Sequence, residues 1–292
     1  MSAGQLAQDL NKAVEQYYDS TIDLYEGLWG EHVHHGYWDL GESPAADGPD
    51  RHAASDRTVS ELAAFAAVPA GAHLLDAGCG IGGPALYLAR ELGCRVEGIT
   101  LSSQQVVRAT DRAREAGLAD QVSFRQLDAV RTDYPDATFD VVWALESLEH
   151  MPDRTAFLAE AWRVLRPGGV LAISTWCIRD GRLDADATGL LDEIYERQAI
   201  PSLPPFGCYD RWCREAGFGD VRVHDWTPYV RNTWDPDFAG VERLDLHDHS
   251  FLRDLARRRG VAALRFFYAI PLMKRAYDEG VMHYAAVAAR KP

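Results

Sequence analysis

The sequence has few cysteines, no long apolar run and no excess of positive charge. Its five cysteines are odd in number, and no two of them are separated by two residues. This pattern excludes a disulfide-rich scaffold and a zinc ribbon, and it is typical of a reducing compartment. No stretch approaches the ~20 apolar residues of a membrane span, and the first 18 residues lack the basic start and apolar centre of a signal peptide. We therefore expect a cytoplasmic protein without a membrane partner.

The charge balance is acidic. The formal net charge is −14, and no long basic run offsets it. Nucleic acids would be repelled, so we expect no nucleic-acid partner. The 292 residues, 47% hydrophobic and 25% charged, suffice for one substantial core with a smaller subdomain.

The most informative motif is an apolar run that ends in Asp76 and is followed by four glycines between residues 78 and 83. A strand, a tight turn and a helix start in this order let a ligand approach bare backbone at the helix N-terminus. The glycines alone also fit a dinucleotide site. However, a diphosphate beside Asp76 would meet a repulsion of roughly 4 kcal/mol gross at ~4 Å and an effective dielectric of ~20. The turn therefore favours a cationic cofactor, and S-adenosylmethionine, with its ammonium and sulfonium, fits.

Apolar strands alternate with helical segments between residues 73 and 176, which predicts a mainly parallel α/β sheet. The expected strands are 73–77, 95–100, 122–127, 139–144, 170–176 and 281–289, and the expected helices are 84–92, 103–116 and 153–165. Helical periodicity broken by prolines dominates the region after residue 180. We expect four segments: N-terminal helices that cover the active site (1–70), a Rossmann-like core (71–180), an inserted helical cap with late core elements (181–280) and a last strand (281–292).

Several ordered motifs together resemble class I S-adenosylmethionine-dependent methyltransferases, and specifically the tocopherol methyltransferase-like group. The motifs are Trp29-Gly30-Glu31, His35-Gly36-Tyr37-Trp38-Asp39, the Asp76 turn, Gly98-Ile99-Thr100-Leu101-Ser102, the segment Leu145 to Asp153, Thr175-Trp176-Cys177 and the segment Met273 to Gly280. The resemblance covers most of the chain. It implies a seven-stranded, mostly parallel sheet with one reversed strand, helices on both faces and a cofactor at the carboxyl ends of the strands.

The resemblance also implies cofactor-binding residues. Asp76, Gly78 and Gly80 match the positions that hold the methionine part. Many members end the second strand with an acid for the ribose, but this chain has Thr100 there, followed by Leu101. In relatives that share Thr-Leu-Ser, a Gln further along the helix reaches the ribose, and Gln105 matches it. The remaining matches are Asp128 and Ala129 for adenine and the carbonyl of Leu145 for the ammonium. Glu97 is expected on the opposite face of its strand.

Methyl transfer needs an aimed acceptor, exclusion of water and, for some acceptors, removal of one proton. The segment from Leu145 to Met151 should face the sulfonium, so Glu146, Glu149 and His150 are the candidate bases. An acid–acid–imidazole cluster is expected to raise the pKa of a carboxylate and to hold a histidine charged. The alternative is that Glu146 only orients backbone and that Glu149 and His150 form an exposed turn.

The acceptor is expected to be a small apolar molecule. Related sugar O-methyltransferases look similar but carry two adjacent histidines in the turn and an Asp after the fifth strand, which this chain lacks. The arrangement here favours transfer to a carbon or nitrogen of an aromatic or terpenoid-like metabolite. Aromatic residues are expected to wall its pocket, namely Tyr25, Trp29, Trp38, Trp176 and Phe206.

Other functions and sites stay open at this stage. An O-methyltransferase of a sugar or phenolic product, a nucleotide-dependent oxidoreductase and a methyltransferase-shaped protein that steers a cyclisation are the alternatives. We expect no metal site. The sequence has no second cluster of metal-ligating residues at a suitable spacing from His32, His34 and His35, so these three are expected to be surface histidines of a loop. N-terminal aromatic residues suggest a homo-oligomer.

Overall fold

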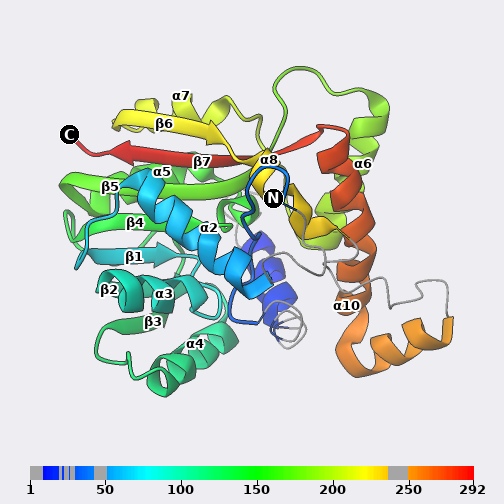
Figure 1. The fold of residues 1–292 in the computed structure, drawn as a ribbon, viewed down its shortest axis with the longest axis horizontal. Coiled ribbons are helices and arrows are strands. Elements are labelled where there is room, and N and C mark those ends of the chain that lie inside the picture. Colours follow the sequence, from blue (N-terminus) through cyan, green and yellow to red (C-terminus); the bar gives the residue numbers. More distant parts are fainter. Residues whose placement is uncertain (1–8, 20–21, 23–25, 27–29, 43–50, 236–248) are drawn as a thin grey trace.

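A single seven-stranded sheet, in the order β3-β2-β1-β4-β5-β7-β6, forms the centre of the molecule (Figure 1). The computed structural model describes residues 9–19, 22, 26, 30–42, 51–235 and 249–292. The strands are β1 (His73–Ala77), β2 (Arg95–Thr100), β3 (Val122–Gln126), β4 (Phe139–Leu145), β5 (Leu165–Ile178), β6 (Gly219–Asp225) and β7 (Met282–Arg290). The first five strands are parallel, and β7 runs antiparallel to β5 and β6. The expected sheet with one reversed strand is therefore confirmed.

Helices cover both faces of the sheet. On one face α2 (Arg51–Ala66), α3 (Gly83–Leu92) and Ala113 of α4 (Ser103–Glu115) share a buried core with β1 and β4. On the other face α5 (Arg154–Val164) and α7 (Cys208–Glu215) pack in a second core. Among the described residues, no helix has the length and apolar character needed to cross a membrane.

Local signals set most element boundaries. The side chain of Ser102 caps α4 by accepting from the N–H of Gln105, and Asp153 caps α5 by accepting from the N–H of Ala156. Gly93 ends α3 in the left-handed region, with φ of 66°. The bounds of these three helices lie within one residue of those expected from the sequence, whereas β5 begins at Leu165, before the expected start at 170.

The region 181–280 contains both helices beyond the sheet and late elements of the main core. Helices α6 (Ala185–Gln198) and α10 (His249–Asp278) pack together around a separate core beyond the end of the sheet (Figure 1). Between them in the sequence, β6 is a strand of the main sheet and α7 packs against one face of that sheet. The strand β6 could not be predicted from the sequence, because it is a short edge strand. Of its residues, only Val221 and Val223 pack against the core. The short helix α8 (Thr227–Val230) and the 3-10 turn η2 (Arg231–Trp234) lead back toward α10.

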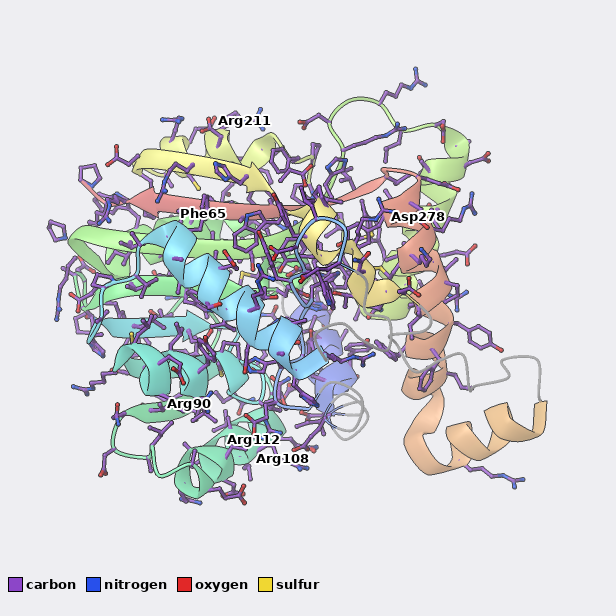
Figure 2. All side chains as sticks on the ribbon, in the orientation of Figure 1. Phe65, Arg90, Arg108, Arg112, Arg211 and Asp278 are labelled. Carbon is purple, nitrogen blue, oxygen red and sulfur yellow. The ribbon has the colours of Figure 1, made fainter. Side chains whose placement is uncertain are left out.

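Helical residues 9–19, here called the N-terminal helix, lie across the carboxyl ends of the strands. Asn11 donates to Asp128, and Asp19 is bonded to Ser102 at the start of α4. Further along, Glu26 accepts hydrogen bonds from Arg108 and Arg112, both labelled on α4 in Figure 2, at 2.6 and 2.9 Å. The N-terminal segment therefore closes over the edge at which a cofactor is expected.

Candidate active site

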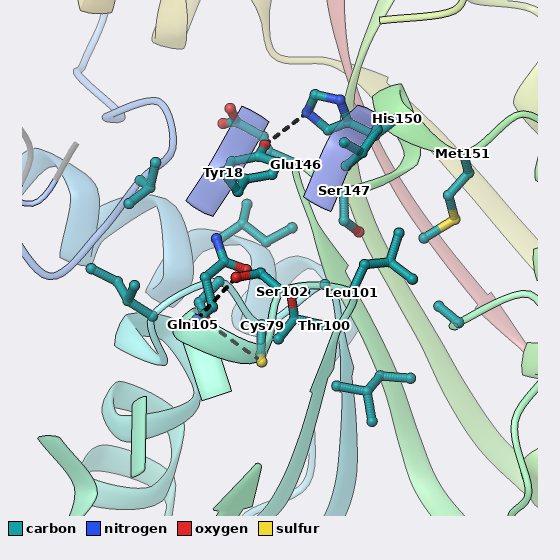
Figure 3. Close-up of a pocket in the computed structure, with 18 of the residues that line it drawn as sticks. Tyr18, Cys79, Thr100, Leu101, Ser102, Gln105, Glu146, Ser147, His150 and Met151 are labelled. Atoms are coloured by element: carbon teal, nitrogen blue, oxygen red, sulfur yellow. Dashed lines mark hydrogen bonds between the residues drawn. The ribbon is translucent and has the colours of Figure 1, made fainter. Parts of the chain in front are cut away.

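A cavity lies at the carboxyl ends of the central strands (Figure 3). The N-terminal helix forms one of its walls through Asn11, Val14, Glu15 and Tyr18. The lining includes most of the residues expected to bind the cofactor, namely Gly78, Gly80, Thr100, Leu101, Gln105, Asp128, Ala129 and Leu145. The structure thus brings these residues together, and we call this space the first cavity.

The two glycines expected to hold the methionine part of the cofactor differ in how much space surrounds them. Gly78 has φ of +90°, and a Cβ there would lie 2.2 Å from the Cβ of Ser147. The Ser147 hydroxyl in turn donates to the carbonyl of Ala77 at 2.7 Å, which ties the turn after β4 to the end of β1. Gly80 also has a positive φ, of +51°, but a Cβ there would meet nothing within 4 Å. Bare backbone at Gly80 therefore faces open space, as a ligand cradle requires.

Asp76 presents a charge that the described residues do not balance. Its side chain is 1% exposed, and Oδ2 has no hydrogen-bond partner among the described residues. Burial raises the pKa of Asp76 to about 7. Asp76 does not itself line the first cavity. A buried carboxylate without a partner is costly, and a cationic donor would lower that cost. The ammonium group of S-adenosylmethionine fits this requirement, whereas a diphosphate does not.

The residues expected to bind the ribose and the adenine have hydrogen-bond partners within the protein. The Thr100 hydroxyl donates to Oε1 of Gln105 at 2.6 Å, so the two residues act as one unit. Asp128 accepts from the N–H of Val130 through Oδ1 and from the Asn11 amide through Oδ2 at 2.7 Å. Glu97 instead pairs with His73 at 2.8 Å and does not line the first cavity, as strand alternation predicted.

Glu146 has every lone pair of its carboxylate in use. Oε1 accepts from the backbone N–H of His35 at 2.7 Å and from the Tyr284 hydroxyl at 2.8 Å. Oε2 accepts from Nδ1 of His35 and from the Trp176 indole, both at 2.9 Å. Burial alone would raise the pKa of Glu146, but the imidazole of His35 and the hydrogen bonds from that residue lower it to about 2. A carboxylate with four donors and a low pKa is a poor base, so the geometry favours the alternative in which Glu146 orients its neighbours.

His35 is the partner that the sequence reasoning missed. Its Nε2 receives a hydrogen bond from the Trp234 indole at 2.6 Å, and an indole can only donate. Nδ1 must therefore carry the proton that bonds Glu146. The imidazole lies within 6 Å, centroid to centroid, of four aromatic rings, those of Trp176, Trp234, Tyr277 and Tyr284. The motif from His35 to Asp39 was visible in the sequence, but its contact with Glu146 spans 111 positions.

His150 is neutral, and the expectation of a charged histidine is wrong. Its Nδ1 bonds the carbonyl of Ala199 at 3.2 Å, so Nδ1 carries the proton and Nε2 accepts from the Tyr18 hydroxyl at 2.7 Å (Figure 3). Burial is the main cause that lowers the pKa of His150 to about 4. Both ring nitrogens are thus engaged, one with the N-terminal helix and one with the end of α6.

Glu149 is buried and only half partnered. It lies in the 3-10 turn η1 (Leu148–His150) and is 2% exposed, so the turn is not exposed as the alternative held. Oε1 accepts from the backbone N–H of Trp176 at 2.9 Å, whereas Oε2 has no partner among the described residues. Burial, followed by the nearby charge of Glu146, raises the pKa of Glu149 to about 8. The expected raised carboxylate pKa therefore belongs to Glu149 and not to Glu146.

A second, smaller cavity adjoins the first. The two share Tyr18, Val33, His34, Glu146 and His150, and the second is also lined by His35, Glu149, Trp176, Gln198, Thr233 and Trp234. Trp176 is thus placed at this cavity as expected.

The other expected substrate residues are placed differently. Trp38 is fully buried, and its backbone N–H bonds the carbonyl of Tyr229, so it lines neither cavity. Phe206 packs in the core beneath the sheet and also lines neither cavity. Tyr25 and Trp29 lie outside the described residues.

The three neighbouring histidines are buried, contrary to the expectation of a surface loop. His32, His34 and His35 are 5%, 6% and 1% exposed. His32 bonds Asp56 through Nε2 at 2.8 Å and His34 through Nδ1 at 3.0 Å. Burial and the proximity of His32 lower the pKa of His34 to about 3. Within the part of the chain that the structure describes, no three His, Cys, Asp or Glu side chains gather to hold a metal ion.

Comparison with known proteins agrees with this geometry. Residues 75–173 match the family model described as a methyltransferase domain. The chain is 36% identical to the probable chloroplastic tocopherol O-methyltransferase of Oryza sativa subsp. japonica, over 97% of this chain and 79% of that protein. It is 39% identical to the 27-O-demethylrifamycin SV methyltransferase of Amycolatopsis mediterranei, over 94% and 95%.

One solved structure is similar over almost the whole chain. The crystal structure of the [4+2]-cyclase SpnF superposes with a TM-score of 0.80 at 31% identity, over 97% of both chains. Together with the buried Asp76, the glycine cradle and the paired cavities, these relationships show that the chain belongs to the S-adenosylmethionine-dependent methyltransferases, in the group that includes the tocopherol methyltransferases.

Proposed function

We propose that this enzyme methylates a carbon or nitrogen atom of an apolar aromatic or terpenoid-like small molecule in specialised metabolism. The observation that carries the proposal is the second cavity, which meets the first at Glu146 and His150. Trp176 and Trp234 wall it, and its described lining contains no lysine or arginine. An anionic acceptor would find no counter-ion there and two glutamates, so an uncharged or cationic acceptor is favoured.

The cofactor-binding roles are part of the proposal. Asp76 and the carbonyl of Leu145 would hold the ammonium of S-adenosylmethionine, and the backbone from Gly78 to Gly80 would accommodate its methionine part. Gln105, oriented by Thr100 and flanked by Leu101, would bind the ribose hydroxyls. The adenine would lie against Asp128 and Ala129. The bound cofactor supplies an electrophilic methyl group whose carrier leaves uncharged.

The chain's own residues aim the acceptor and exclude water. The four hydrogen bonds to Glu146 fix the floor between the two cavities. Tyr18, bonded to His150, closes the wall that the N-terminal helix provides. A fixed approach and a closed wall are the contributions that an in-line displacement requires of the protein.

The test is incubation with isotopically labelled S-adenosylmethionine and matched acceptors. The panel contains an electron-rich quinol with a prenyl tail, an aromatic amine, a phenol and the phosphate ester of that phenol, with products identified by mass spectrometry. Methylation of the quinol ring or of the amine, but not of the phosphate ester, is the expected result. Tight binding of S-adenosylhomocysteine without any methylated product would reject the proposal.

Two alternatives have specific support. Both curated relatives described above are methyltransferases, and the rice protein is named an O-methyltransferase, which keeps a phenolic hydroxyl as a possible acceptor. The similarity to a [4+2]-cyclase keeps a steered cyclisation as a second candidate function. A polyene consumed without a change of mass would identify the cyclisation. Family membership removes the oxidoreductase alternative.

We also propose that the enzyme acts in the cytoplasm as a homo-oligomer. All five cysteines are free and four of them are buried, which suits a reducing compartment. The rice relative is named chloroplastic, so cell fractionation is the direct measurement. Sedimentation velocity would test the oligomer.

A further inference from the structure

Glu149 differs from Glu146 and His150, its neighbours in the turn, because one of its oxygen atoms has no hydrogen-bond partner among the described residues. The carboxylate of Glu146 accepts four hydrogen bonds, and both ring nitrogens of His150 are engaged. Glu149 lines the second cavity, and its Oε2 is buried without a partner among the described residues. A side chain that is 98% buried with a free oxygen is costly unless a ligand completes it.

The position of Glu149 is held from two sides. Its Oε1 accepts from the backbone N–H of Trp176 at the end of β5. Arg154 donates to the main-chain carbonyl of Glu149 and so fixes the turn without pairing with the carboxylate. The carboxylate therefore has a defined place beside Trp176, and Glu149 lines the cavity that the first cavity adjoins.

Burial and the groups that face Glu149 raise the pKa of its carboxyl group. Arg154 is the cation that favours ionisation, and it is outweighed by burial and by Glu146. The titratable and charged neighbours, by element, are Tyr18 from the N-terminal helix, Glu146 after β4, His150 in the same turn, Arg154 from α5, Cys177 from β5, Tyr209 from α7, Tyr277 from α10 and Tyr284 from β7. A group that titrates near the operating pH is suited to accept a proton during catalysis.

We propose that Oε2 of Glu149 receives the hydrogen bond of the methyl acceptor and takes the proton that the acceptor loses. This inference rests on the proposed methyltransferase function. The acceptor's electron pair forms the new bond to the methyl carbon, and the sulfur–carbon bond breaks with its pair left on sulfur. The N–H proton of an amine, or the ring proton of a methylated quinol carbon, passes to the carboxylate of Glu149, which becomes a carboxylic acid. The substrate class is thus one whose acceptor atom carries a hydrogen.

The variant Glu149→Gln separates binding from proton transfer. The amide keeps the acceptor for Trp176 N–H and resembles the protonated acid, but it cannot take a proton. The matched control is Glu97→Gln, a part-buried carboxyl on the opposite face of the sheet that lines neither cavity. Both variants are expected to bind S-adenosylhomocysteine within about twofold of the wild type by titration calorimetry.

Two readouts test the proposal. With the acceptor that the wild type methylates, Glu149→Gln is expected to reduce kcat by about 10²- to 10⁴-fold and to abolish its rise between pH 6.5 and 8. Infrared difference spectra of each protein with S-adenosylhomocysteine, recorded against pH, should show a carboxylic acid band in the wild type and in Glu97→Gln that is missing from Glu149→Gln.

The outcomes are distinct. A Glu149→Gln rate within threefold of the wild type with the same pH profile would overturn the role of Glu149 and leave the methyltransferase function intact. A band that titrates identically in Glu149→Gln would also overturn it, without any need for turnover. No product from the wild type would overturn the proposed function itself.

Discussion

Replacing Glu146 by Gln should destabilise the protein strongly, because the site offers four donors and an amide has one acceptor. If the amide nitrogen replaces Oε1, the backbone N–H of His35 faces another donor and loses its hydrogen bond. The Tyr284 hydroxyl can instead turn toward the Ser174 hydroxyl, which lies 3.1 Å away. If it replaces Oε2, it faces the indole of Trp176 and the imidazole of His35. The first orientation loses less and should be adopted.

The magnitude follows from these contacts. One buried donor left unpaired costs about 1 to 3 kcal/mol, and the loss of charge from the remaining bonds brings the total to about 3 to 5 kcal/mol. For a chain of this size, about 2 °C of Tm is lost per kcal/mol, which gives a decrease of about 6 to 10 °C. Differential scanning calorimetry at pH 7 measures it.

The control for this experiment is again Glu97→Gln. That side chain is 20% exposed and is hydrogen-bonded to His73, so its replacement should lower the Tm by no more than about 2 °C. A Glu146→Gln protein that melts within about 1 °C of the wild type would refute the inference that the hydrogen bonds of Glu146 fix the structure between the two cavities.

Three further predictions use other parts of the site. Asp76→Asn should raise the Kd for S-adenosylhomocysteine by roughly 10- to 100-fold, since a charge-assisted hydrogen bond is lost; an unchanged Kd by calorimetry would contradict the ammonium role. Gly78→Ala should abolish binding or folding because its Cβ would lie 2.2 Å from that of Ser147, whereas Gly80→Ala, with open space, should fold and bind less tightly; circular dichroism and calorimetry separate the two. The pKa of Glu149 rises on folding from 4.5 to about 8, so the wild type should lose stability as pH rises from about 5 to 8. Glu149→Gln lacks this titration, and urea denaturation should show its relative stability growing over that interval; a constant difference would reject the raised pKa.

The sheet was predictable because its signals are local. Strands such as His73–Ala77 and Arg95–Thr100 are short apolar runs, and Ser102 and Asp153 cap the helices that follow by bonds to residues three positions away. These patterns depend on neighbouring residues alone. The edge strand β6 escaped because an edge needs little apolar surface and leaves a weak alternation.

The proton chemistry was not predictable from the motif that contains it. Glu146, Glu149 and His150 lie within five positions, yet the pKa is lowered at Glu146 and His150 and raised at Glu149. The difference arises from partners far away in the sequence. His35 and Tyr284 lie 111 and 138 positions from Glu146, and Tyr18 lies 132 positions from His150.

The amino-acid sequence by itself determined the cofactor class and the sheet that carries it, because the acid of Asp76, the glycine turn and the apolar periodicity act over a few residues. Tertiary structure decided which side chain is free to accept a proton. Distant elements supply four donors to Glu146 and engage both nitrogens of His150, while burial leaves one oxygen of Glu149 without a partner among the described residues. The availability of an acceptor is a property of the assembled site, since it depends on which donors the fold brings within 3 Å.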